Sequence, residues 1–413
     1  MVVATQQEAI RAGYKQTEVG VIPENWEVKI LGSVLSRCHL GGNYPNQDGE
    51  TSYPLMKMGN IDRGYIDTDK VEYISSDVMP DPLDRLRYGD ILFNTRNTLD
   101  LVGKVAIWRN ELPVAYFNSN LMRLEFNPDE VCSNEYANYA LNSPSGISRL
   151  RALATGTTSV AAIYTRDLLQ LPFIVPPPSE QRAIAAALSD VDALVASLDL
   201  VLTKKRNIKT AALQQLLTGE RRLAGFRGEW RVKRLGTVLK FQVGFPFSSV
   251  FFNQKDNGIR LVKNRDLKSD ELIYHYSGKY APTYLVVDGD VLIGMDGDFM
   301  PCLWRKGSAL LNQRVGRIVV STGMDRTFAY YFLLEPLKAI ETVTSSTTVK
   351  HLSHGDVENI ERVIPAMEEQ TAIATILSDM DGDIAALEAR RDKAQALRQG
   401  MMQQLLTGNI RLV

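Results

Sequence analysis

Apolar residues step by four and three through residues 184–202, and the same alternation returns through residues 373–387. Such spacing lines one face of a helix with apolar side chains, as at the a and d positions of a coiled coil. A long helix with one apolar stripe needs a partner, so the sequence predicts two helices that pair in antiparallel fashion. The predicted pairing residues are Ile184, Leu188, Val191, Val195, Leu198 and Leu202 in the first helix, and Ile373, Leu377, Met380, Ile384 and Leu387 in the second.

The two helical segments are copies of one sequence. Residues 180–219 align with residues 369–408 without a gap, and both copies end in the string QQLLTG. A polar patch interrupts the apolar seam at the same place in each copy. We expect the seam to resume in a shared register, at Ile208, Ala212 and Leu216 and at Leu397, Met401 and Leu405.

The ends of these helices carry start and stop signals. Prolines at 176–178 exclude a helix upstream of the first copy, and Ser179 is a suitable N-cap. Gly219 and Gly408 are natural stops after each copy. Each helix would be about 58 Å long at about 1.5 Å per residue.

Two segments with a different residue pattern lie at 21–175 and 225–363. Short β-branched and aromatic runs alternate there with Gly, Asn and Asp turns, which is typical of compact α+β domains. Trp26 and Trp230 each open a matching string, WxVKxLGxVL, so the two globules share a scaffold although their loops differ.

The expected fold is therefore α+β: two globular α/β domains separated by two long helices packed as an antiparallel coiled coil, with a pseudo-two-fold relation between the halves. The expected division is an N-terminal segment at 1–20, a first globule at 21–175, a central helix at 176–224, a second globule at 225–363 and a C-terminal helix at 364–413.

The composition of the 413 residues is that of an ordinary globular protein, with 45% hydrophobic and 23% charged residues. The formal net charge of −1 shows no overall basic excess, so any site for a polyanion must come from local placement of Lys and Arg. Cys38, Cys132 and Cys302 form no CxxC pair, which argues against a disulfide framework and a zinc cage. No apolar stretch suits a membrane helix or a signal peptide, and we expect the chain in the cytoplasm.

The sequence lacks the motifs of common catalytic sites. It contains no GxxxxGK[ST] phosphate loop, no GxSxG elbow and no HExxH helix. His351 and His354 have a spacing that would let both bind one metal ion, but a plain pair of surface loop residues is the simpler explanation. Asp296 and Asp298 would suit a Mg²⁺ ion, but a turn after a strand explains them more simply. We therefore expect no catalytic residue and no metal site in this chain.

The repeated strings resemble those of a known family. PPxSEQxAIAxxLSDxD at 176–192, QQLLTG at 214–219 and the second copy EQxAIAxxLSDxD at 369–381 are similar to conserved regions of the specificity subunit (HsdS) of type I restriction-modification enzymes. The opening YKQTEVGVIPxxW at 14–26 is similar to the start of the same family.

This resemblance implies a subunit that is not catalytic by itself. In that family the globules are target recognition domains on double-stranded DNA, and the helices form the spacer between them. The subunit docks two adenine methyltransferase (HsdM-type) subunits, which use S-adenosylmethionine, and restriction (HsdR-type) translocase-nuclease subunits, which use ATP and Mg²⁺. No cofactor is expected on this chain. A coiled-coil scaffold that binds only proteins, and a self-contained nuclease or methyltransferase, stay open as alternatives.

Two different globules on a rod predict an asymmetric DNA target in two parts, with unread base pairs between them. Polar loop positions are the candidate DNA contacts, because their side chains reach phosphates and base edges, although each of them is also compatible with a merely solvated surface. The candidates are Lys57, Arg63, Arg96, Asn97, Thr98, Thr157, Thr158 and Ser159 in the first globule, and Lys263, Asn264, Arg265, Asp298, Thr347, Thr348 and Lys350 in the second.

Several residues repeat in both helices without serving the apolar seam. Such positions either cap and pair locally or form a docking surface that is presented twice. The candidates for partner docking are Gln181, Asp190, Asp192 and Gln214, with their copies Gln370, Asp379, Asp381 and Gln403.

Overall fold

A computed structural model describes residues 10–47, 49–343 and 351–412. Contacts divide the chain into two compact units, one formed by Met1–Leu198 with Arg390–Val413 and the other by Asp199–Ala389. Each long helix therefore contributes one part to each unit. The five-part division drawn from the sequence remains a prediction.

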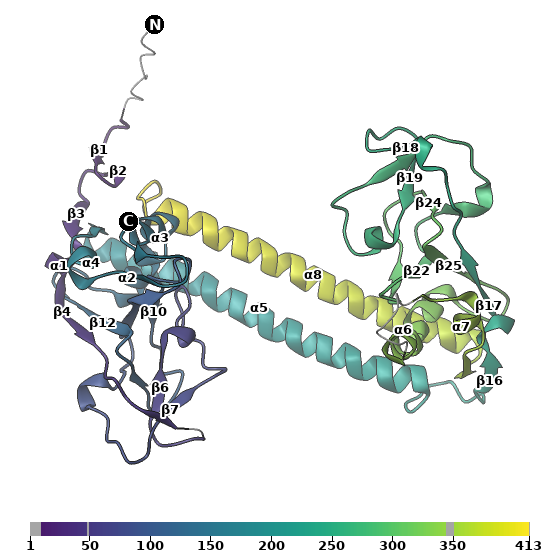
Figure 1. Cartoon of the computed structure of the whole chain (residues 1–413), viewed down its shortest axis with the longest axis horizontal. Helices are drawn as coiled ribbons and strands as arrows, with labels where there is room; N and C mark the ends of the chain where they lie inside the picture. Colours follow the sequence, from purple (N-terminus) through teal and green to yellow (C-terminus); the bar gives the residue numbers. More distant parts are fainter. Residues whose placement is uncertain (1–9, 48, 344–350, 413) are drawn as a thin grey trace, which may run out of the picture. The chain divides into compact units, whose positions relative to one another are not determined.

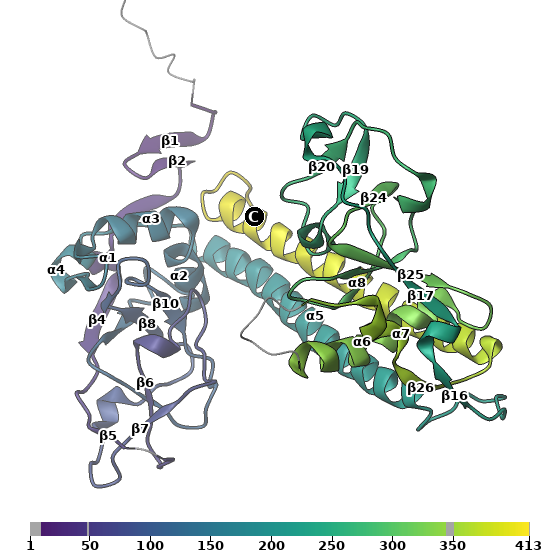
Figure 2. The same ribbon diagram turned by 45° about the vertical axis from the view of Figure 1, so that its right-hand side comes forward.

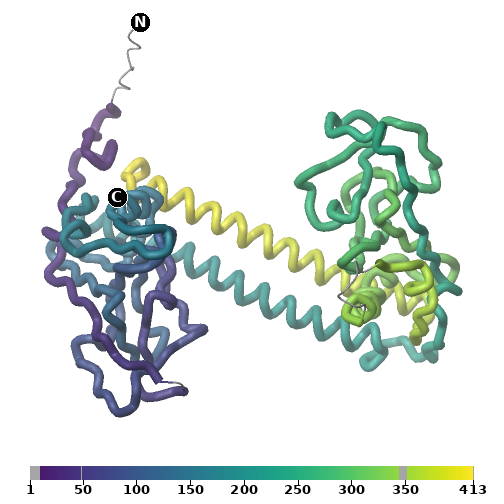
Figure 3. Tube along the Cα trace, viewed as in Figure 1, coloured from purple at the N-terminus to yellow at the C-terminus, as the bar shows by residue number. Residues whose placement is uncertain are grey.

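The two long helices are α5 (Pro178–Thr218) and α8 (Met367–Leu405), which Figure 3 traces in teal and yellow. α5 begins one residue before the predicted N-cap Ser179, because proline fits the first turn of a helix. Each helix is followed by a glycine with positive φ, Gly219 at 75° and Gly408 at 72°. Glycine adopts this conformation without steric cost, which explains why the stop signal repeats.

The first globule contains two four-stranded sheets with the orders β10-β8-β12-β4 and β11-β6-β7-β5, and a small sheet with the order β13-β14-β9. Figure 1 labels β10, β12 and β4 of the first sheet and β6 and β7 of the second. β11 pairs with β6 in parallel. The elements of this part are β1 (Tyr14–Thr17), β2 (Gly20–Pro23), β3 (Glu27–Ile30), α1 (Leu31–Val34), β4 (Leu35–Leu40), β5 (Asn46–Gln47), β6 (Pro54–Met56), η1 (Met58–Asn60), β7 (Glu72–Ile74), η2 (Pro82–Asp84), β8 (Ile91–Asn94), β9 (Arg96–Asn97), β10 (Val105–Ile107), β11 (Tyr116–Phe117), β12 (Leu121–Phe126), α2 (Asn134–Leu141), α3 (Pro144–Ala152), β13 (Thr155–Gly156), β14 (Ala161–Ala162), α4 (Thr165–Leu168) and β15 (Pro172–Val175).

The second globule repeats the two larger sheets with the orders β23-β22-β25-β17 and β21-β24-β19-β20-β18, and β21 is an additional edge strand. β24 pairs with β19 in parallel, and Figure 2 shows these two strands beside β20 in the second unit. Its elements are β16 (Arg231–Arg234), η3 (Leu235–Thr237), β17 (Leu239–Val243), η4 (Ser249–Phe251), β18 (Phe252–Asn253), β19 (Ile259–Val262), η5 (Asn264–Leu267), β20 (Tyr274–Tyr276), η6 (Pro282–Tyr284), β21 (Leu285–Val286), β22 (Val291–Gly294), β23 (Pro301–Leu303), β24 (Ala309–Leu311), β25 (Val315–Val320), α6 (Arg326–Val343), α7 (His354–Glu358) and β26 (Glu361–Ile364).

Matched turns show why the topology repeats. Gly89 and Gly289 have φ of 88° and 90°, and each precedes an aspartate that leads into β8 or β22. The Asp90 carboxylate accepts a hydrogen bond from Arg87 N–H at 2.9 Å, and Asp290 accepts one from Val287 N–H at 3.1 Å. The shared Gly-Asp strings therefore encode the same turn twice.

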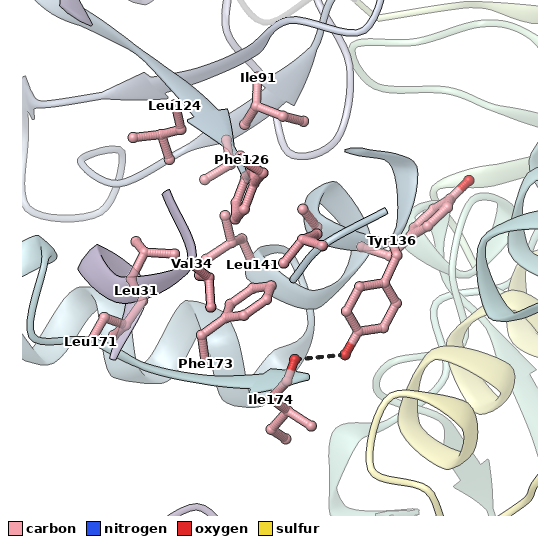
Figure 4. Close-up of a cluster of buried hydrophobic side chains, with 14 of the residues drawn as sticks. Leu31, Val34, Ile91, Leu124, Phe126, Tyr136, Leu141, Leu171, Phe173 and Ile174 are labelled. Carbon is pink, nitrogen blue, oxygen red and sulfur yellow. Dashed lines mark hydrogen bonds between the residues drawn. The ribbon is translucent and has the colours of Figure 1, made fainter. Parts of the chain in front are cut away.

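Each globule builds its core together with the adjoining helix segments. In the first unit the Phe126 and Phe173 rings lie 5.8 Å apart, and the buried Tyr136 hydroxyl donates to the Ile174 carbonyl at 3.0 Å (Figure 4). Leu188 of α5 joins this core, and in the second unit Leu377 of α8 has the corresponding role. Among the described residues, no helix has the length and apolar character needed to cross a membrane.

Candidate nucleic-acid interface

Three loops of the first globule meet at one edge of its sheets. β6 and β11 run parallel, so their carboxyl ends lie side by side, and Asn118 N–H donates to the Met56 carbonyl at 3.1 Å. The loop after β8 joins them, because Thr95 N–H donates to the Asn120 carbonyl at 3.0 Å. The residues that follow β6, β8 and β11 form what we term the first edge, and they include the predicted contacts Lys57, Arg96, Asn97 and Thr98.

A small sheet brings two predicted contact segments together. β14 lies between β13 and β9, with Ala162 opposite Arg96 and Ala161 opposite Asn97. Leu99 N–H also donates to the Thr158 carbonyl at 3.1 Å. The exposed Thr157, Thr158 and Ser159 therefore lie beside the residues after β8, although the two segments are far apart in the sequence.

Two basic candidates of the first globule, Lys57 and Arg63, differ in their partners. Lys57 Nζ lies 2.6 Å from the Glu72 carboxylate, which neutralises its charge locally. Arg63 is half-buried, and burial together with the nearby Arg151 lowers the pKa of its guanidinium. Its Nη2 has no hydrogen-bond partner among the described residues.

The second globule builds the corresponding edge from the residues that follow β19, β22 and β24, and we term it the second edge. Asn312 N–H donates to the Val262 carbonyl at 3.4 Å, and Asn264 Nδ2 donates to the Asp296 carbonyl at 2.7 Å. The predicted contacts Lys263, Asn264, Arg265 and Asp298 all belong to this edge. The predicted contacts Thr347, Thr348 and Lys350 lie outside the described residues.

Most charged candidates on the second edge have a partner. Asp298 lies 2.6 Å from Lys268, and the hydrogen bond between them lowers the pKa of Asp298. Arg265 is exposed and lies 3.5 Å from the buried Asp266. Lys263 is half-buried and lies over an aromatic ring instead.

The residues after β11 and β24 were not predicted from the sequence. Arg314 is exposed on the second edge and lies 3.3 Å from Asp296. Asn118 and Asn312 occupy matching positions, at the start of the strings NSNL and NQRV. A repeated Asn turn after a short apolar strand was the signal that could have identified these loops.

His351 and His354 lie in different local environments. His351 Nδ1 lies 3.0 Å from Asp296 Oδ1, whereas His354 is the first residue of α7. Asp296 therefore has Arg314 as its ion-pair partner and His351 as a hydrogen-bond partner. In the part of the chain that the structure describes, no group of three metal-binding side chains occurs.

Two of the predicted docking residues are buried, which corrects their assignment. Gln181 is 0% exposed, and its amide bonds with Cys132 N–H, the Glu130 carbonyl and the Pro176 carbonyl, each at 2.9 Å. Gln370 is 1% exposed and makes the same three kinds of bond, with Asp325 N–H, the Gly323 carbonyl and the Pro365 carbonyl. Both glutamines hydrogen-bond a long helix to the backbone of a globule, so their side chains are not available on a docking surface.

The other docking candidates fall into two classes. The hydroxyls of Tyr139 and Tyr331 donate to Asp192 and Asp381 at 2.8 and 2.6 Å, so these two aspartates also link globule to helix. The exposed candidates are Asp190, Asp379, Gln214 and Gln403.

The helices pair in antiparallel fashion within each unit. In the first unit Arg398 pairs with Asp192, and in the second unit Lys205 lies 2.8 Å from Asp383 while Lys209 pairs with Asp381. Ile184, Leu188, Leu198, Leu202, Ile373 and Leu377 are buried, and Val191, Val195, Met380, Ile384 and Leu387 are half-buried.

The predicted resumption of the seam is wrong at two residues. Ile208 is 46% exposed and Leu397 is 54% exposed. Heptad steps from Leu202 lead to Lys205 and Lys209, which are half-buried, and not to Ile208. The seam therefore continues through basic residues that pair with aspartates of the facing helix, where the sequence suggested an interruption.

Comparison with known proteins agrees with this architecture. Residues 23–204 and 227–396 match the family described as type I restriction modification DNA specificity domain. The sequence is 26% identical over 424 residues to the protein of Methanocaldococcus jannaschii named "Putative type I restriction enzyme MjaX specificity subunit", with 97% of each chain covered. It is 34% identical over 193 residues to the EcoBI specificity subunit of Escherichia coli, which covers 46% of this chain and 41% of that protein. The crystal structure of a type I restriction-modification S subunit from M. genitalium is similar, with a TM-score of 0.63, 16% identity, and 92% of this chain and 96% of that chain covered, which shows a shared fold.

Proposed function

Because this chain belongs to the family of type I restriction-modification DNA specificity domains and is a specificity subunit, not a catalytic one, we propose that each globule reads one half of an asymmetric DNA target. One observation carries this proposal: the same scaffold occurs twice, while the side chains on its two edges differ. The residues after β8 begin Thr95-Arg96-Asn97, whereas those after β22 begin Met295-Asp296-Gly297. Different donors and acceptors on one scaffold select different bases.

The proposed partners are double-stranded DNA, two adenine methyltransferase subunits and restriction subunits. The methyltransferase would carry S-adenosylmethionine, and the restriction subunit would carry ATP and Mg²⁺. Two exposed pairs of repeated residues, Asp190 with Asp379 and Gln214 with Gln403, support a docking surface that occurs once on each long helix. The cytoplasm, where these partners meet host DNA, is the proposed location.

Selection from random DNA tests the reading of two half-sites. The chain is assembled with its methyltransferase subunit, incubated with random-sequence duplexes, and the retained duplexes are sequenced. We expect enrichment of two short, different motifs at a constant separation. Replacing residues 21–175 with the corresponding globule of another specificity subunit should change one motif and leave the other unchanged. Retention of duplexes without any two-part motif would contradict the proposal and favour a scaffold that binds only proteins.

A further inference from the structure

Lys57 and Lys263 occupy the same backbone site in the two globules. Each follows a strand of the mixed sheet, β6 or β19, and precedes a short 3₁₀ helix. Lys57 N–H donates to Asn60 Oδ1 at 2.9 Å, and Lys263 N–H donates to Asp266 Oδ2 at 2.8 Å. The chain thus presents one lysine position twice, with the same local hydrogen bond.

Strand pairing determines what faces each lysine. Leu55, two residues before Lys57, lies opposite Glu72, whereas Leu261, two residues before Lys263, lies opposite Tyr274. The neighbouring strand therefore supplies a carboxylate in the first globule and an aromatic ring in the second at the matching register.

These neighbours give the two ammonium groups different electrostatics. Lys57 Nζ lies 2.6 Å from Glu72, whereas Lys263 Nζ lies 3.1 Å from the centre of the Tyr274 ring and 5.0 Å from that of Phe252. No carboxylate among the described residues forms an ion pair with Lys263, and partial burial lowers the pKa of its ammonium. Aromatic faces attract a cation without neutralising it, so Lys263 keeps its charge for a ligand.

The neighbouring cations of the second edge differ from Lys263. Lys268 pairs with Asp298, Arg314 pairs with Asp296, and Arg265 lies next to Asp266. Each of these has a carboxylate within 3.5 Å. On the described part of the second edge, Lys263 is therefore the basic side chain most available to bind an anion.

We propose that Lys263 contacts a backbone phosphate of double-stranded DNA in the half-site of the second globule. In the first globule, the ion pair with Glu72 prevents Lys57 from making the corresponding contact. The inference rests on the proposed reading of DNA by both globules. An ammonium group is a compact charge that suits a single phosphate oxygen, whereas bidentate recognition of a base needs a planar donor pair. Each phosphate neutralised by a lysine releases about one counterion, which makes affinity depend on salt.

The test compares matched variants in the chain assembled with its methyltransferase subunit. The probe is the duplex that the wild-type complex enriches from a random library, and the dissociation constant is measured over a series of salt concentrations. Lys263→Met keeps the aliphatic stem on the rings, and we expect weaker binding, a salt slope smaller by about 0.9 and an unchanged base preference. Lys57→Met serves as the control and should leave the slope unchanged.

A reciprocal variant tests the role of Glu72. Glu72→Tyr rebuilds in the first globule the arrangement found around Lys263, so the salt slope should grow by about 0.9 and binding should tighten. An unchanged slope in Lys263→Met, in a wild-type complex that enriches a two-part duplex, would overturn this inference and leave the proposed function intact. Loss of preference at one base position would overturn it as well, because it would indicate a base contact. A wild-type complex that enriches no duplex would overturn the proposed function itself.

Discussion

The buried Glu180 carboxylate accepts a hydrogen bond from Arg411 Nε at 2.5 Å, which joins the start of α5 to the segment after α8. Trp26 Nε1 donates to the same carboxylate at 3.2 Å. The second unit repeats the arrangement, because Arg222 and Trp230 donate to Glu369 at 2.6 and 3.1 Å. Each carboxylate therefore holds the start of a globule and the end of the facing helix in one cluster.

Removing Arg411 should destabilise the first unit. Arg411→Ala leaves Glu180, which is 2% exposed, with Trp26 as its remaining donor, and an underpaired buried charge is costly. We expect a loss of about 2–3 kcal/mol in the free energy of unfolding, measured by urea denaturation.

A surface arginine provides the control for this variant. The side chain of Arg166 is 86% exposed and lies 3.2 Å from its neighbour Asp167, so Arg166→Ala should have no measurable effect. Arg222→Ala should destabilise the second unit in the same direction as Arg411→Ala does the first. Equal stabilities of Arg411→Ala and Arg166→Ala would show that the Glu180 cluster does not hold the unit together.

Stability should depend on alkaline pH through Tyr139. Burial, and also the hydrogen bond to Asp192, raise the pKa of Tyr139 to about 12, above the value near 10 of an unfolded chain. Because the folded pKa is raised, the stabilisation is fully present below pH 10 and is lost as the pH rises from about 10 to about 12. Urea midpoints across this range should fall less steeply in Tyr139→Phe than in the wild type.

The exposed Tyr88 supplies the comparison. Its side chain is 63% exposed, so Tyr88→Phe should keep the wild-type pH dependence. Identical slopes for Tyr139→Phe and Tyr88→Phe would show that the Tyr139–Asp192 bond contributes nothing to the alkaline transition.

The corrected seam makes Leu216 and Ile208 a matched pair. Leu216 is 7% exposed and packs in the core of the second unit, whereas Ile208 is 46% exposed on the same helix. Leu216→Ala should therefore lower the free energy of unfolding by about 2–4 kcal/mol, and Ile208→Ala by less than about 1 kcal/mol. Urea denaturation of both variants measures the difference. A larger loss of unfolding free energy in Ile208→Ala would support the predicted seam through Ile208.

Local signals made the long helices predictable. The alternation of four and three, the prolines at 176–178, and the glycines at 219 and 408 all act within a few residues, so the sequence alone contains them. The matched strings that begin at Trp26 and Trp230 likewise predicted the repeated scaffold, because each string forms a strand followed by a short helical segment, α1 or η3.

Tertiary contacts could not be predicted from the sequence. Gln181 and Gln370 looked available for a partner because they lie off the apolar seam, yet each accepts a hydrogen bond from a backbone N–H 49 or 45 residues earlier in the chain. Ile208 looked like a seam residue because it is apolar, whereas the heptad register favours Lys209, which became recognisable only through its pairing with Asp381. Polar residues that pack against distant backbone carry no periodic signal.

The length of the helices provides the last prediction. Inserting seven residues after Thr203 and seven after Asp392 preserves the heptad register and lengthens each helix by about 10.5 Å. If the helices set the separation of the two half-sites, the unread gap should grow by about three base pairs, at about 3.4 Å each. Methylation mapping of host DNA by single-molecule sequencing would measure the gap. Inserting two residues at the same places turns the apolar face of each helix by about 200°, so this control should lose assembly. An unchanged gap after the seven-residue insertions would show that helix length does not set the spacing of the half-sites.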